Sequence, residues 1–192
     1  MSKRDALAAR PDGRLYSRPT RRCVAILNNI APSRRFELIE LARELHKKGL
    51  REFSRNDGRI LVPISVERIR DYIGHLHALG LIVEADKRFG LVAAFRKPSS
   101  DPEWAQYLSD VARKHLADIL NIKAGDLPKR FETEIREMHG QEKVPTLSAV
   151  MGALGIEGTR REELFRWSLF LYTDGDACPI EIHRYPHIAP KA

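Results

Sequence analysis

Apolar residues recur with helical spacing in two adjoining stretches of the first half of the chain. From Thr20 to Ile30 they predict a short helix that ends before Pro32. From Phe36 to Leu45 they predict a second helix, with Ser33 as its N-cap and Gly49 as its stop. Two consecutive amphipathic helices are therefore expected before residue 50.

A third stretch, from Ile64 to Leu79, shows the same period in its clearest form. Ser65 is the expected N-cap, and Gly80 is the expected stop. One face is polar, and Arg68 and His75 are expected to flank it. The apolar stripe consists of Val66, Ile69, Tyr72, Ile73, Leu76 and Leu79, and the outward face of Glu67, Arg70, Asp71, Gly74 and Ala78.

Two β-hairpins are predicted on either side of this third helix. Before it, the turn sequence Asn56-Asp57-Gly58 separates short apolar stretches within residues 50–64. After it, strands at Leu81–Ala85 and Leu91–Phe95 enclose the charged turn Asp86–Gly90.

Two prolines frame a polar run at Lys97–Pro102, which predicts a domain boundary. A helix is expected to follow, with Asp101 as its cap, and the aromatic-rich apolar stripe from Trp104 to Ile122 suggests a dimerisation surface. The remaining elements expected are a helix at Leu127–His139, a helix at Thr159–Tyr172 that opens with a Thr159–Glu162 capping box, and a strand-like tail at Ile180–Tyr185.

These elements predict a mainly α protein with three parts. Residues 1–18 are interpreted as a flexible basic arm, because they contain prolines, a glycine and scattered arginines without a sustained period. Residues 19–97 form the first domain. Residues 98–192 form a helical second domain, for dimerisation or partner binding, with a short C-terminal tail.

Charge separates the two halves of the chain. Its composition is ordinary for a globular protein, with 43% hydrophobic and 31% charged residues, but its net charge is +7 and its pI about 9.6. Residues 1–97 hold 21 Lys and Arg against 11 Asp and Glu, whereas residues 98–192 hold 12 against 15. A net charge of +10 beside one of −3 is typical of a nucleic-acid-binding module joined to a neutral one, although a basic face can also be merely solvated.

The order of third helix, glycine, strand, basic turn and strand resembles that of winged helix-turn-helix DNA-binding domains. The resemblance rests on Arg68–Leu81, RIRDYIGHLHALGL, which runs directly into the hairpin. It implies that the third helix is a recognition helix and that the hairpin with Lys87 and Arg88 is the wing. One departure from the pattern is the length of residues 49–64 between the second and third helices.

The resemblance also implies which side chains contact DNA. The third helix enters the major groove, where its first residues reach base edges, and basic residues at the wing and at the starts of the preceding helices contact phosphates. The predicted contacts are Arg21, Arg22, Arg34, Arg35, Ser65, Arg68, Arg70, His75, Lys87 and Arg88.

Two features of this helix bear on its predicted contact with DNA. Glu67 and Asp71 repel phosphates, which counts against indiscriminate binding, but Glu and Asp can accept hydrogen bonds from cytosine, as Arg can donate to guanine. Gly74 costs about 1 kcal/mol relative to alanine, which a close approach of another backbone or helix would explain.

Other sites receive less support. A second helix-turn-helix is conceivable at 146–166, but Met151 and Arg161 stand where small and apolar residues are expected. Cys178, His183 and His187 make a poor zinc motif, and His75 and His77 lie on different sides of one helix. No nucleotide-binding or catalytic motif is present, so the sequence predicts no enzyme, no metal and no cofactor.

The function expected from the sequence is selective binding of double-stranded DNA, as a transcriptional regulator acting as a homodimer. A winged-helix adaptor subunit of a larger complex and a plasmid or mobile-element replication initiator remain alternatives. Two separated cysteines, and the lack of a membrane-spanning run or signal peptide in the sequence, make the cytoplasm the expected location and argue against a membrane partner.

Overall fold

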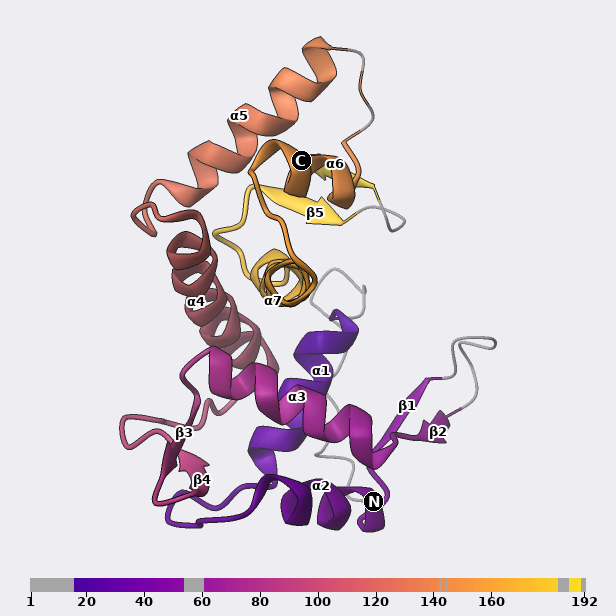
Figure 1. The fold of residues 1–192 in the computed structure, drawn as a ribbon, viewed down its shortest axis with the longest axis vertical. Coiled ribbons are helices and arrows are strands. Elements are labelled where there is room, and N and C mark those ends of the chain that lie inside the picture. Colours follow the sequence, from indigo (N-terminus) through magenta and orange to yellow (C-terminus); the bar gives the residue numbers. More distant parts are fainter. Residues whose placement is uncertain (1–15, 54–60, 142, 144, 183–186, 191–192) are drawn as a thin grey trace. The chain divides into compact units, whose positions relative to one another are not determined.

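The protein folds mainly as helices, with three short antiparallel pairs of strands among the residues described (Figure 1). The structure is a computed structural model that describes residues 16–53, 61–141, 143, 145–182 and 187–190. These residues divide into two compact units. The first unit is Arg21–Lys97, and the second combines residues 16–20 with Pro98–Ala192.

The first unit holds three helices and two hairpins. Its first helix begins among residues of the second unit, so the chain enters the first unit already helical. In chain order the elements are α1 (Arg18–Asn28), α2 (Leu38–Lys47), β1 (Arg51–Phe53), β2 (Leu61–Pro63), α3 (Val66–Ala78), β3 (Ile82–Ala85) and β4 (Arg88–Leu91).

Helix α3 forms where the third apolar repeat predicts it. The Ser65 hydroxyl accepts a hydrogen bond from the Arg68 amide at 3.3 Å, which confirms Ser65 as the N-cap. Ile69, Ile73 and Leu76 are completely buried, and the helix packs against α2. Full burial of each such side chain contributes about 1.5–3 kcal/mol, so this stripe fixes the rotation of α3 about its axis.

Helix α2 starts later than the sequence suggests. Its N-cap is Glu37, which forms a capping box with Glu40, and Ser33 takes no part. Phe36, expected to be helical, instead forms an antiparallel bridge with Phe89 through two N–H···O hydrogen bonds of 2.9 Å. The Phe36 ring also stacks on the Phe89 ring, so tertiary pairing overrides the helical period at this position.

Both predicted hairpins are present. Strands β1 and β2 pair with Arg51 opposite Pro63, and the turn sequence at residues 56–58 lies outside the described residues. Strands β3 and β4 pair with Ala85 opposite Arg88, which leaves a turn of two residues, Asp86 and Lys87.

The second hairpin differs from the prediction in the extent of its turn. The sequence suggests a turn through Gly90 and a strand from Leu91, whereas β4 already begins at Arg88. The bridge from Phe36 to Phe89 explains the difference, because it draws Phe89 and its neighbours into extended pairing.

The second unit is a helical domain with one terminal hairpin. Its central helix, α7, buries residues on several sides, among them Phe165, Ser168, Leu169 and Tyr172. Its elements are α4 (Asp101–Leu120), α5 (Leu127–Gly140), α6 (Leu147–Ala153), α7 (Thr159–Thr173), β5 (Ile180–Ile182) and β6 (Ile188–Pro190).

Three boundaries of this unit correct the sequence interpretation. Ser100, not Asp101, caps α4, because its hydroxyl accepts from the Glu103 amide. Gly158 occupies the N-cap position of α7, so Thr159 forms no capping box. At the other end of the chain, Tyr16, which the sequence interpretation includes in the flexible arm, is 3% exposed and therefore packed within the fold.

The apolar stripe of α4 is used within the second unit. Leu108, Ala112 and Leu116 are fully buried, and α4 runs along α7. The Ser109 hydroxyl donates to the Tyr172 carbonyl at 3.0 Å across this contact. Part of the stripe is therefore used inside the second unit, whereas Tyr107, Val111, Ile119 and Leu120 are only half-buried. The homodimer stays a prediction.

Within the described ranges, every helix is too short or too polar to cross a lipid bilayer.

Two glycines give a matched test of the packing. A Cβ at Gly74 would meet nothing within 4 Å, whereas one at Gly175 would collide with the Ser109 side chain. Gly74→Ala should therefore raise the free energy of unfolding by up to about 1 kcal/mol, through helix propensity. Gly175→Ala should lower it by about 1–3 kcal/mol through overpacking. Chemical denaturation of both variants checks this, and equal effects would contradict the described packing.

Candidate nucleic-acid interface

The outward face of α3 carries an uncovered polar stripe. Glu67, Arg70 and Asp71 are exposed, and they share one face of the helix with Gly74. Hydrogen bonds to its own backbone and to Ser65 lower the pKa of Glu67, so this carboxylate is charged at neutral pH. The stripe therefore presents both signs of charge within two turns.

Arg68 lies at the edge of this stripe and is half-buried. Ser65, which precedes the helix, is exposed, and its hydroxyl is engaged as the cap. Of the residues predicted on α3, Ser65, Arg68 and Arg70 are thus at or near the accessible face.

His75 is placed differently from the prediction. It is 7% exposed, and its Nδ1 lies 2.7 Å from the Asp71 carbonyl, one turn earlier in the same helix. The expectation that His75 flanks the outward face is wrong. Position 75 lies one turn after the buried position 72, so it adjoins the buried face of the helix. A side chain so covered has little surface for a base.

His77 is the exposed histidine of α3. Its Nδ1 lies 2.8 Å from the Ile82 carbonyl, and its ring meets the Phe89 ring edge-on at a centroid distance of 5.5 Å. His77 thus joins the end of α3 to the β3–β4 hairpin. The sequence pattern assigns no role to His77, and the signal that could have identified it is its position in the last turn of α3, shortly before the hairpin.

The β3–β4 hairpin holds exposed basic residues at its tip. Lys87 and Arg88 are both exposed. Asp86 and Lys87 have φ values of +52° and +60°, a backbone region that favours glycine and asparagine. The structure therefore holds a lysine where a strained backbone disfavours it.

Arg35 is the residue that the fold brings to this hairpin. It is exposed, and its guanidinium lies close above Gly90 of β4: a Cβ added to Gly90 would fall 2.6 Å from the Arg35 Nη1. The loop between α1 and α2 thus adds a third basic side chain beside β4.

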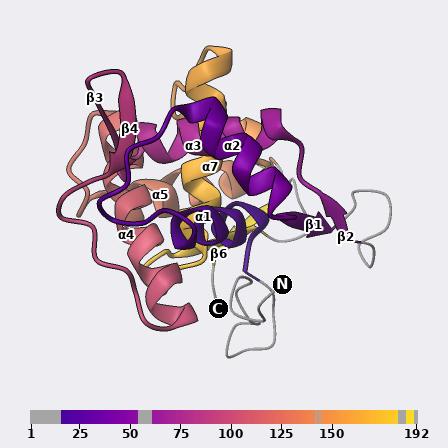
Figure 2. The same cartoon turned by 90° about the horizontal axis from the view of Figure 1, so that it is seen from below.

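The two hairpins of this unit lie at the two ends of α3. Figures 1 and 2 place the β1–β2 hairpin at the end of α3 opposite the β3–β4 hairpin.

Arg34, its neighbour, is half-buried and already paired. It forms a salt bridge with Glu44 of α2, which also accepts from Lys48 at 2.7 Å. Hydrogen bonds lower the pKa of Glu44 to about 2, and the bond from Arg34 has a larger effect than the bond from Lys48. Arg34, which the sequence predicts to contact DNA, is therefore used in a salt bridge that stabilises the fold.

Arg22 lies inside the first unit. It is 7% exposed, donates a hydrogen bond to the Tyr72 hydroxyl, and has its guanidinium carbon 4.8 Å from the centre of the Tyr72 ring. Burial raises the pKa of Tyr72 to about 12, and the charge of Arg22 opposes this shift. The predicted phosphate contact by Arg22 conflicts with this burial, whereas its neighbour Arg21 is half-buried.

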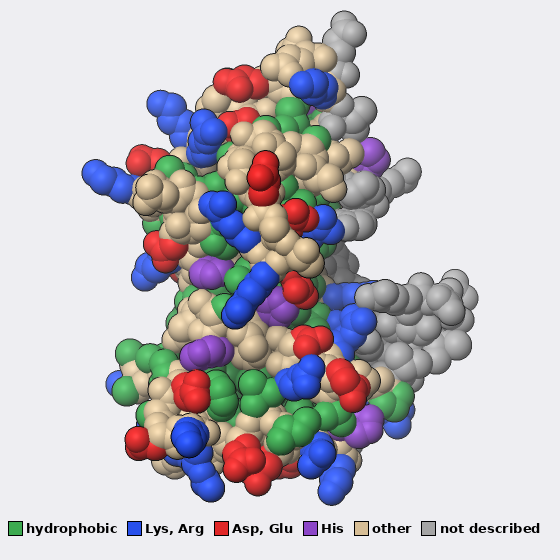
Figure 3. Space-filling view, in the orientation of Figure 1, with side chains coloured by type: hydrophobic (Ala, Val, Ile, Leu, Met, Phe, Trp, Pro, Cys, Tyr) green, Lys and Arg blue, Asp and Glu red, His purple; other side chains and the backbone are tan. Residues whose placement is uncertain are grey.

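The charged surface of the first unit is mixed. On the face of this unit that Figure 3 shows, Lys and Arg side chains alternate with Asp and Glu, and hydrophobic side chains lie between them. The excess of basic residues in the first half therefore does not form one continuous patch on that face.

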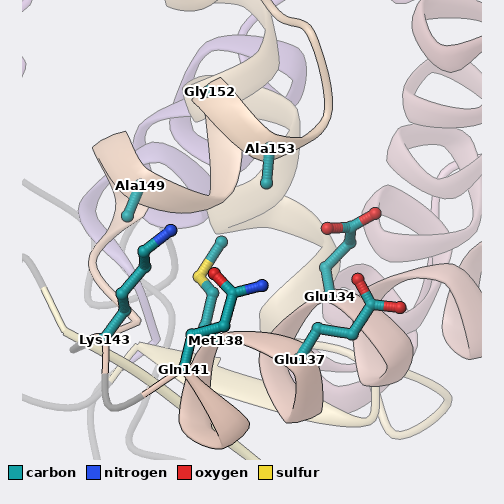
Figure 4. A pocket seen from close by; sticks show the side chains of 8 residues that line it. All are labelled: Glu134, Glu137, Met138, Gln141, Lys143, Ala149, Gly152 and Ala153. Atoms are coloured by element: carbon teal, nitrogen blue, oxygen red, sulfur yellow. The ribbon is translucent and has the colours of Figure 1, made fainter.

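The second unit contains a cavity of about 330 Å³ between α5 and α6. Figure 4 shows Glu134 and Glu137 on one side, Lys143 on the other, and small residues of α6 above. Glu134 is buried and lies 2.7 Å from Arg130, its partner one turn earlier. Among the described residues that line it, none is a cysteine, serine, threonine or histidine.

Two of the basic residues of α7, Arg161 and Arg166, have structural partners. Arg161 donates to the Ile119 carbonyl at 2.6 Å, and Arg166 lies 3.8 Å from Glu162. Both contacts agree with a packing role for the segment that resembles a second helix-turn-helix.

Both cysteines are buried and unbridged. Burial raises the pKa of the Cys23 thiol far above its usual range, which keeps it protonated. Cys178 donates to the Ile180 carbonyl, and His183 of the weak zinc motif lies outside the described residues. Among the residues that can be described, no group of three ligands is placed to hold a metal ion.

No protein-family model, curated protein or solved structure matches this chain.

The Arg34–Glu44 pair predicts a pH dependence of stability. Because the pKa of Glu44 falls from 4.5 to about 2 on folding, its contribution is complete above pH 4.5 and is lost as the pH falls to about 2. Glu44→Gln should lower the free energy of unfolding at pH 7 by up to about 1 kcal/mol, a modest value because both groups are a third exposed. Denaturation between pH 7 and pH 2 should show a smaller acid loss in the variant than in the wild type. A parallel acid loss in both proteins would contradict the assignment.

Proposed function

We propose that the first unit is a winged helix-turn-helix module that binds double-stranded DNA, as a sequence-selective regulator. In this proposal α3 enters the major groove and the β3–β4 hairpin contacts the backbone as a wing. Arg22 and His75 are omitted from the contact set because they are buried, and Arg34 because it is paired with Glu44.

The observation that carries the proposal is an exposed polar stripe on α3 followed in the chain by an anchored hairpin with an exposed basic tip. The tip presents Lys87 and Arg88. A helix fits the major groove, and basic side chains beside it can hold phosphates on its rim. Arg35, which lies over β4, extends this basic edge.

Anchoring of the hairpin supports its role as a wing. The Phe36–Phe89 bridge ties β4 to the loop before α2, and His77 ties β3 to α3. A hairpin held at two points presents its tip with little loss of conformational entropy on binding.

The strained backbone at Lys87 supports the proposal independently. A residue other than glycine, asparagine or aspartate at positive φ costs about 1 kcal/mol or more, and such strain concentrates at functional sites. A lysine at this position is explained if its ammonium group is used in binding.

The first experiment measures DNA binding with two charge-matched variants. Fluorescence anisotropy of labelled random duplexes across a salt series should show salt-sensitive binding by the wild type. A quadruple variant, Arg68→Ala/Arg70→Ala/Lys87→Ala/Arg88→Ala, should lose it, with the salt slope falling by about 0.9 for each phosphate contact removed. The control removes four exposed basic side chains from the second unit, as Lys114→Ala/Lys123→Ala/Lys129→Ala/Arg160→Ala.

The outcome separates specific contact from total charge. Retained binding by the control and lost binding by the first variant support the proposal. Equal loss in both variants would show a general charge effect. Weak binding that none of the changes affects would instead favour a protein-binding adaptor, which the mixed charge in Figure 3 also suits.

Lys87→Gly tests the hairpin tip by itself. Glycine relieves the positive φ, so the free energy of unfolding should rise by up to about 1 kcal/mol. DNA affinity at low salt should fall at the same time, and the salt slope should drop by about 0.9. Thermal or chemical denaturation and anisotropy measure the two effects, and a stabilised variant with unchanged affinity would remove Lys87 from the interface.

A further inference from the structure

The exposed stripe of α3 combines one hydrogen-bond donor with acceptors. Arg70 and Asp71 are both exposed, and neither side chain forms a hydrogen bond or ion pair with another described residue. Glu67 lies one turn earlier on the same face, and its pKa is lowered in part by the charge of Arg70. Arg70 and Asp71 are therefore available to a partner.

A carboxylate in the major groove restricts which bases it can face. It repels the phosphates on either side, and it also repels the acceptor atoms of guanine and the O4 of thymine. It is satisfied only by an exocyclic amino group, such as N4 of cytosine or N6 of adenine. Asp71 is thus a costly residue on a DNA-facing surface unless it meets such a donor.

Arginine has the complementary requirement. Its guanidinium fork matches the two adjacent acceptors N7 and O6 that guanine presents in the major groove. An adenine–thymine pair interrupts its acceptors with the adenine amino group and so offers no equivalent pair. Among the four bases, guanine therefore suits Arg70 best.

The two requirements meet in one base pair. Arg70 and Asp71 are adjacent in sequence and about 100° apart around the helix, so their side chains diverge from neighbouring points of the backbone. A G·C pair presents the guanine acceptors beside the cytosine amino group along the same groove edge. Gly74, where an added Cβ would meet nothing within 4 Å, leaves room for the groove to approach the helix.

Resting on the proposed function, we infer that the exposed stripe of α3 selects G·C base pairs, with Arg70 placed against guanine and Asp71 against the paired cytosine. Asp71 then acts as a specificity determinant. It lowers affinity for DNA in general and preserves affinity where a cytosine amino group faces it.

Competition between duplex pools of equal length tests the selection. The wild type should prefer a random pool that contains G·C pairs over a pool made only of A·T pairs, by about tenfold. Asp71→Asn should reduce this preference severalfold and strengthen binding to the A·T pool, because the amide removes the repulsion and suits adenine. The control, Asp118→Asn, makes the same chemical change on an exposed residue of α4 and should leave the preference unchanged.

Modified bases test each contact in a duplex selected from the random pool. Replacing guanine by 7-deazaguanine removes N7, and it should weaken wild-type binding but have little further effect on Arg70→Ala. Replacing cytosine by N4-methylcytosine blocks its amino group, and it should weaken the wild type but have little further effect on Asp71→Asn.

The outcomes distinguish this inference from the function on which it rests. Salt-sensitive binding with equal affinity for both pools would overturn the G·C selection and leave DNA binding in place. Base changes that weaken each variant as much as the wild type would also overturn the assignment of Arg70 and Asp71. Failure of the wild type to bind any duplex would overturn the proposed function itself, and this inference with it.

Discussion

The rotation of α3 about its own axis controls what the first unit offers to a partner. Ile69, Ile73 and Leu76 are completely buried, and together they contribute several kcal/mol of hydrophobic stabilisation. A rotation by one residue would carry charged side chains into the core. The same burial that stabilises α3 therefore leaves the stripe of Glu67, Arg70 and Asp71 facing outward.

A second constraint acts through the β3–β4 hairpin. An isolated two-stranded hairpin has little stability of its own. The bridge between Phe36 and Phe89 and the contact of His77 with both strands hold it to the helices. This anchoring can also support the unfavourable backbone of the Asp86–Lys87 turn, which places Lys87 at the exposed tip.

The charge of the first half serves two purposes that composition alone does not separate. Arg22 is buried against Tyr72, and Arg34 is paired with Glu44, so these cations belong to the packing of the unit. Arg35, Arg70, Lys87 and Arg88 remain exposed. Because acidic and basic residues alternate on α3, recognition there depends on the arrangement of donors and acceptors more than on net charge.

The sequence by itself determined the elements whose signals are local. The helical period and the Ser65 cap located α3, and the same period placed α5 and α7 nearly in full, because each signal lies within one or two turns of chain. The outward stripe of α3 followed from that period. Only the tertiary structure decided that Phe36 is extended, that β4 starts at Arg88, and that Arg22 and His75 are buried. Each of these outcomes depends on contact with other parts of the fold, which periodicity along the chain does not encode.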